Sequence, residues 1–136
     1  MLLLNSLVLA FAATYARADE LLMFYSPYCP HCARFMDDVV LDADPYHGEI
    51  PLTIINMVTI DESDPNYWWI RKAYSEGRLK GIHYTPTFVV WIGDHETGRE
   101  SERFVGYINK EDFYKRLHAV MEAYKGAHPD YQPQTN

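Results

Sequence analysis

Two cysteines, Cys29 and Cys32, have the residue type and spacing for chemistry, and they are the only cysteines among the 136 residues. A Cys-x-x-Cys pair is typical of a redox dithiol, of half a metal site or of a structural disulfide. In the chain-entropy model, closing a loop of about four residues stabilises a fold by roughly 2 kcal/mol, against about 4.7 kcal/mol for a loop of about 100 residues. A structural disulfide here would constrain little, so the pair is interpreted as a redox dithiol or as part of a metal site.

The metal hypothesis requires further ligands, because two thiolates alone do not complete a Cu(I) or Zn(II) site. His83, close to the Thr85-Pro86 segment, is the best candidate for a third ligand. The other histidines are His31, His47, His95, His118 and His128. The sequence has no second cysteine pair and no closely spaced pair of histidines. We therefore expect no metal and no cofactor apart from the Cys29–Cys32 disulfide itself, and we keep a metal carrier that uses Cys29, Cys32 and His83 as the alternative.

Residues 1–18 are predicted to be a secretory signal peptide. The segment is almost entirely apolar up to Ala16, and Ala16-Arg17-Ala18 fits an A-x-A cleavage site before Asp19. Its apolar run of about 15 residues is shorter than the roughly 20 that a membrane-spanning helix needs, which favours a cleaved leader over an anchor. A secretory leader implies an oxidising compartment, and we expect a periplasmic or secreted protein.

Composition predicts one folded domain. The chain is 48% hydrophobic and 15% aromatic, which is ample for a packed core. We expect the domain over residues 19–126 and a disordered, proline- and glutamine-containing tail over residues 127–136. Loss of Arg17 with the leader would change the formal net charge from −7 to −8, and such a surface repels phosphate backbones. We expect no nucleic-acid partner and, because no dimerisation domain or additional cysteine is visible, a monomer.

Hydrophobic patterns predict an α/β fold with the element order β-α-β-α-β-β-α. Apolar and β-branched runs indicate strands over residues 21–26, 52–58, 87–92 and 102–105. Apolar residues at helical spacing indicate helices from Pro30 to Asp44, from the Asp64 cap to Gly77, and from the Asn109 cap to Gly126. A parallel crossover followed by a hairpin gives a four-stranded mixed sheet with helices on both faces. Trp68 and Trp69 are predicted to pack in the core, with exposed substrate contact as the alternative.

The dithiol is predicted to lie at the carboxyl end of the first strand, where open α/β sheets place their sites. Cys29 would begin a helix, whose unsatisfied N–H groups and dipole stabilise a thiolate. Cys32 would lie one turn further in, buried and protonated. In the predicted mechanism Cys29 attacks a disulfide and Cys32 resolves the mixed disulfide. Pro30 would initiate the helix and stiffen the turn, and His31 would donate to the Cys29 thiolate or offset its charge.

Together these residues resemble the thioredoxin superfamily over nearly the whole chain after the leader. The resemblance rests on Cys29-Pro-His-Cys32 after a buried strand, on Thr85-Pro86 before the third strand, and on the element order, which matches a minimal thioredoxin fold. It implies that Pro86 is cis and packs against the dithiol, and that the backbone of Thr85 pairs with a bound substrate. Tyr28 stands where thioredoxins have tryptophan, so Tyr28, Thr85 and Pro86 are the expected substrate-binding residues.

The direction of exchange is predicted from finer resemblances. The Pro-His dipeptide is similar to that of the bacterial periplasmic disulfide oxidases. The chain departs from those oxidases because it lacks their helical insertion and has Thr85 before the proline. It departs from the oxidases and from thioredoxins alike in having Met23 where both carry a buried carboxylate. The short secreted form and the run from Arg103 to Tyr107 resemble small periplasmic thioredoxins that maintain thiols on a partner protein. We therefore favour a reductase over an oxidase or isomerase, with a protein thiol or disulfide as substrate and a membrane redox partner that recycles the dithiol.

Overall fold

The computed structural model describes residues 19–130, so the predicted signal peptide (1–18) and the end of the predicted tail (131–136) lie outside the described residues. The strands are β1 (Glu20–Tyr25), β2 (Leu52–Asn56), β3 (Thr87–Ile92) and β4 (Arg99–Val105). The helices are α1 (Pro30–Phe35), which continues into a π-helical turn (Met36–Val40), α2 (Tyr67–Ser75) and α3 (Lys110–Ala127). The predicted order β-α-β-α-β-β-α is confirmed.

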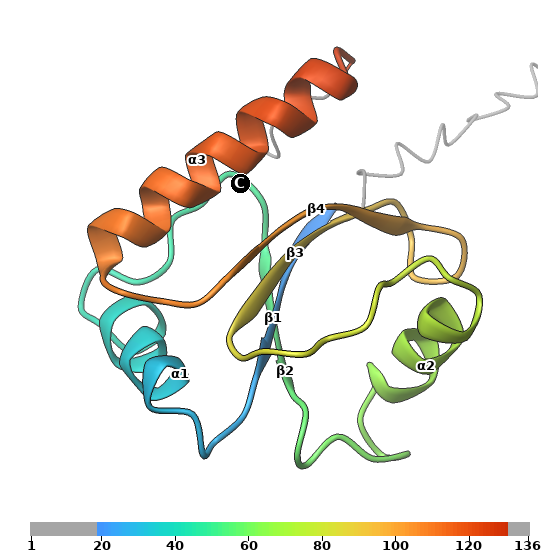
Figure 1. Cartoon of the computed structure of the whole chain (residues 1–136), viewed down its shortest axis with the longest axis horizontal. Coiled ribbons are helices and arrows are strands. Elements are labelled where there is room, and N and C mark those ends of the chain that lie inside the picture. The colour runs from blue at the N-terminus through green and yellow to red at the C-terminus, as the bar shows by residue number, and fades with distance from the viewer. Residues whose placement is uncertain (1–18, 131–136) are drawn as a thin grey trace, which may run out of the picture.

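The four strands form one mixed sheet in the order β2-β1-β3-β4. β1 pairs in parallel with β2 and antiparallel with β3, and β3 pairs antiparallel with β4. Helices α1 and α3 cover one face of the sheet and α2 covers the other (Figure 1). The predicted α/β class and minimal thioredoxin-like fold are therefore confirmed.

The central strand β1 explains the continuous apolar run in the sequence. Its side chains alternate between the two faces of the sheet, and Leu21 and Met23 pack in the core beneath α1 and α3. Leu22 and Phe24 pack in a second core on the α2 face. Because both faces are covered, no position on the strand between its ends is left for a polar residue.

Helix α1 ends earlier than the sequence predicts. The π-helical turn closes with a hydrogen bond from Leu41 N–H to the Met36 carbonyl, 2.9 Å, and the helix stops at Val40 instead of continuing to Asp44. The Asp42 carboxylate accepts from Asp44 N–H and from Lys110 Nζ, at 3.2 and 3.0 Å. A side chain that accepts from a backbone N–H two residues further on competes with helix formation, which explains the early end.

Helix α2 begins later than predicted. Asp64 does not cap it, because the Asp64 carboxylate accepts from Asn66 N–H, 2.7 Å, and forms a turn before the helix starts at Tyr67. Gly77 follows its carboxyl end with a φ of 75°, the left-handed conformation that glycine adopts most readily. Trp69 is buried as predicted, whereas Trp68 is 60% exposed.

The carboxyl-terminal elements largely match the prediction. Strand β4 starts at Arg99, three residues before the predicted Glu102, and a register shift at Val90/Trp91 interrupts its pairing with β3. The side chain of Asn109 caps α3 by accepting from Asp112 N–H, 2.8 Å. The helix continues through Ala127, one residue past the predicted end at Gly126. Among residues 19–130, no helix is long and apolar enough to span a membrane.

Candidate active site

The two cysteines lie where β1 passes into α1, as predicted. Cys29 is the N-cap residue of α1 and Pro30 occupies its first position, where the missing N–H of proline leaves no hydrogen bond unmade. Cys32 N–H donates to Cys29 Sγ, 3.2 Å, so the first cysteine caps the helix that carries the second. Both thiols are free; Cys29 is partly exposed and Cys32 is buried.

The environment of Cys29 favours its thiolate. Partial burial acts to raise the pKa of Cys29, but hydrogen bonds from the Cys32 thiol, from the Thr85 side chain and from the backbone N–H groups of Cys32 and His31 outweigh it, and the net pKa is lowered. The surface position leaves the sulfur accessible to a second molecule. Cys29 therefore has both properties that a nucleophilic thiol needs.

Cys32 has the opposite environment. Burial, followed by the hydrogen bond to Cys29, raises the pKa of Cys32 to about 11. Its side chain lies in the apolar core that also contains Met23, and both residues are 0% exposed. Met23 thus places a thioether where the resemblance would put a carboxylate, and the proton of Cys32 must leave through water or another group.

The opposite shifts predict different pH profiles for the two thiols. Iodoacetamide should alkylate Cys29 with an apparent pKa below the roughly 8.5 of a free cysteine, whereas Cys32 should stay unmodified until the pH approaches its pKa of about 11. Cys32→Ala should raise the pKa of Cys29, because it removes the thiol donor. Mass spectrometry after alkylation across a pH series measures both profiles, and an unchanged Cys29 pKa in Cys32→Ala would contradict this account.

The Thr85-Pro86 loop lies directly against the dithiol. The Cys29 thiol donates to the Thr85 carbonyl oxygen, 3.3 Å, and the Thr85–Pro86 peptide bond is cis. Pro86 is buried, and its carbonyl accepts from Gly106 N–H, 2.8 Å, which brings the β4–α3 loop to the same end of the sheet. The structure therefore brings together two of the predicted substrate-binding residues and the dithiol.

Exposed apolar side chains surround this end of the sheet. Tyr28 is 83% exposed and Tyr84 is 71% exposed. Ile108, in the loop that Gly106 ties to Pro86, is also exposed. Tyr28 was a predicted contact residue, whereas Tyr84 and Ile108 were not. The sequence could have indicated Tyr84 as a contact residue, because it lies next to Thr85-Pro86. It could not have indicated Ile108, whose position depends on the contact between Gly106 and Pro86, two residues that are far apart in the sequence.

The ring of His31 is turned to a different partner from the predicted one. His31 Nδ1 lies 2.6 Å from Arg34 Nη2, and a guanidinium group only donates, so Nδ1 is the acceptor. In this arrangement the ring is hydrogen-bonded to Arg34 and not to Cys29. His31 stabilises the Cys29 thiolate through its backbone N–H instead.

The structure does not assemble the three ligands of the metal-carrier alternative. Across residues 19–130, no group of three or more His, Cys, Asp or Glu side chains is placed to hold a metal ion. The ring of His83 lies over Gly81, where an added Cβ would come within 3.0 Å of His83 Nε2. His83 lines a pocket on the α2 face of the sheet.

Comparison with known proteins agrees with this geometry. Residues 12–121 match the family described as thioredoxin-like domain. The chain belongs to this family. With its intact Cys29–Cys32 pair it falls in the class of thioredoxin-like thiol–disulfide oxidoreductases.

Two individual proteins illustrate the likeness. Protein disulfide-isomerase 1 of Dictyostelium discoideum is 28% identical over 106 residues, which cover 73% of this chain and 26% of that protein. This chain thus spans about a quarter of the length of that relative. The reduced periplasmic thioredoxin SoxS from Paracoccus pantotrophus superposes with a TM-score of 0.51 and 25% identity, over 76% of this chain and 96% of that one.

Proposed function

We propose that the protein is a periplasmic thiol–disulfide oxidoreductase that reduces a disulfide on a protein partner, with Cys29 as nucleophile and Cys32 as resolving thiol. The observation that carries the exchange chemistry and the two roles is the difference between the two thiols. Cys29 is accessible with a lowered pKa, whereas Cys32 is buried with a pKa of about 11. The likeness to a periplasmic thioredoxin supports the compartment.

The first step is attack of the Cys29 thiolate on one sulfur of the partner's disulfide. That disulfide breaks, a mixed disulfide forms with Cys29, and the released partner thiolate takes a proton from water. Cys32 then loses its proton and attacks Cys29 Sγ, which breaks the mixed disulfide and releases the second partner thiol. The partner gains two electrons and two protons, and the Cys29–Cys32 disulfide remains. A membrane redox partner would return two electrons to it.

One feature of the site supports the reducing direction. Stabilising the Cys29 thiolate stabilises the reduced protein and makes the pair more oxidising, and the His31 ring was the residue predicted to add to this effect. In the structure that ring is hydrogen-bonded to Arg34, so it makes no hydrogen bond to the thiolate.

The reduction potential tests the direction. Equilibration with thiol–disulfide buffers of defined potential, followed by alkylation and mass spectrometry, should give a value closer to the roughly −270 mV of a reductant than to the roughly −120 mV of an oxidant. A value near about −120 mV would overturn the reducing direction while leaving thiol–disulfide exchange in place. The experiment therefore separates the class of chemistry from its direction.

A further inference from the structure

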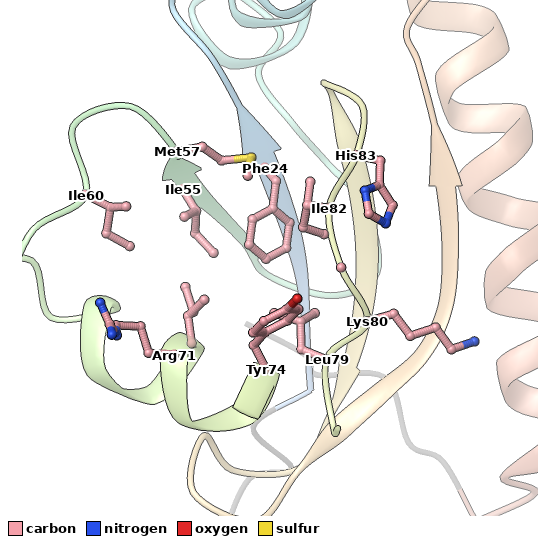
Figure 2. Close-up of a pocket in the computed structure, with 12 residues that line it drawn as sticks. Phe24, Ile55, Met57, Ile60, Arg71, Tyr74, Leu79, Lys80, Ile82 and His83 are labelled. Atoms are coloured by element: carbon pink, nitrogen blue, oxygen red, sulfur yellow. The ribbon is translucent and has the colours of Figure 1, made fainter. Parts of the chain in front are cut away.

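A second concave site lies on the α2 face of the sheet. It is a pocket of about 320 Å³, within the lower part of the size range of small-molecule sites. Phe24 and Ile55 form its floor on β1 and β2, and α2 contributes Ile70 and Tyr74 (Figure 2). Residues 79–83 form the opposite wall. Neither cysteine lines it, so the proposed exchange mechanism leaves it unused.

The wall formed by residues 79–83 is held in place by β4. Arg103 donates to the carbonyl oxygens of Lys80 and Gly81, at 3.1 and 2.9 Å. The Lys80 N–H donates to the Glu100 carboxylate, 2.9 Å, and Glu100 is itself paired with Arg103. Because these bonds fix the backbone on one side and α2 fixes the other, the pocket is formed before any ligand arrives.

The charged residues that line the pocket have one sign. Arg71, Lys80 and His83 are the basic residues of the lining, and no carboxylate lines it, although the chain as a whole has a net charge of −7. Figure 2 shows Arg71 and His83 on opposite sides of the apolar lining, with the Lys80 side chain extending away from it. One Arg71 nitrogen donates to the Tyr67 hydroxyl, 2.7 Å, which orients the guanidinium and leaves its other N–H groups for a ligand.

We propose that this pocket binds a small amphipathic carboxylate. The apolar chain of the ligand lies against Phe24 and Ile55, and its carboxylate pairs with Arg71 at the mouth. The permanent charge and planar fork of an arginine suit a carboxylate, and the apolar floor suits an aliphatic chain. This site goes beyond the proposed function because binding here requires no thiol.

Isothermal titration calorimetry with straight-chain carboxylates tests the proposal. Affinity should rise about fourfold for each methylene added from hexanoate to decanoate, the value expected for burying a methylene group. Decanoate should bind one site, and nonyltrimethylammonium, which has the same alkyl chain with a cationic head, should bind at least about tenfold more weakly. Equal affinity for the two head groups, or no binding of decanoate, would overturn the proposal.

Two variants locate the binding. Arg71→Gln should weaken decanoate about tenfold, the lower end of the range for a hydrogen bond to a charged group, whereas Arg99→Gln, an exposed arginine outside the pocket, should have no effect. Ile60→Trp, which adds volume at the pocket lining, should weaken decanoate by a similar or larger factor. If Ile60→Trp does not fold, the surface change Arg71→Gln decides, and unchanged affinity in it refutes the site.

Cys29→Ser should bind decanoate normally, so this inference and the proposed redox function fail independently.

Discussion

Cys29→Ser should reduce disulfide exchange to the uncatalysed background, because a serine hydroxyl does not ionise near neutral pH and cannot replace the thiolate. Reduction of a disulfide-containing protein such as insulin, followed by turbidity, measures the loss. The substitution changes one atom at a partly exposed position, so the thermal unfolding midpoint should stay close to that of the wild type. Full exchange activity in Cys29→Ser would refute its role as nucleophile.

Cys32→Ser provides the matched variant. It retains the nucleophile but removes the thiol that resolves the mixed disulfide, so a covalent complex between Cys29 and the partner should accumulate. A non-reducing gel or mass spectrum should show this complex in Cys32→Ser and not in Cys29→Ser. The trapped species would also identify the partner, which the proposed function specifies only as a protein with a disulfide.

Phe35→Ala should lower the free energy of unfolding by about 3–5 kcal/mol, a large part of the stability of a small domain. Phe35 is 0% exposed, and its ring makes edge-to-face contacts with Phe88, Tyr107 and Phe113, with ring centroids 5.0 to 5.4 Å apart. These rings come from β3, the β4–α3 loop and α3, so the residue joins the dithiol helix to the rest of the core.

Urea unfolding measures this effect, with Trp68→Ala as the control. Trp68 is 60% exposed on α2, and removing its ring should cost about 1 kcal/mol or less. Phe35→Leu should fall between the two because it leaves a smaller cavity. Similar losses in Phe35→Ala and Trp68→Ala would contradict the role of Phe35 in joining α1 to the core.

Local chemistry accounts for the parts of the fold that the sequence predicts well. The apolar run of β1 indicates a strand buried on both faces, and the side chain of Asn109 can cap a helix whatever packs around it. Boundaries that depend on competing side-chain contacts were missed. The end of α1 depends on Asp42 and its contact with Lys110, and the start of α2 depends on the turn that Asp64 makes.

The sequence by itself determined that a cysteine pair follows a buried strand and begins a helix, because strand periodicity, Pro30 and the spacing of the thiols are local properties. Only the tertiary structure decided how the two thiols differ. The pKa of Cys32 rises because the core closes over it, and Cys29 meets the Thr85 carbonyl across 56 residues of sequence. The turning of the His31 ring to Arg34 and the basic rim of the α2-face pocket likewise depend on where side chains point. Burial, desolvation and hydrogen-bond geometry are properties of the folded chain, which is why residue spacing alone does not reveal them.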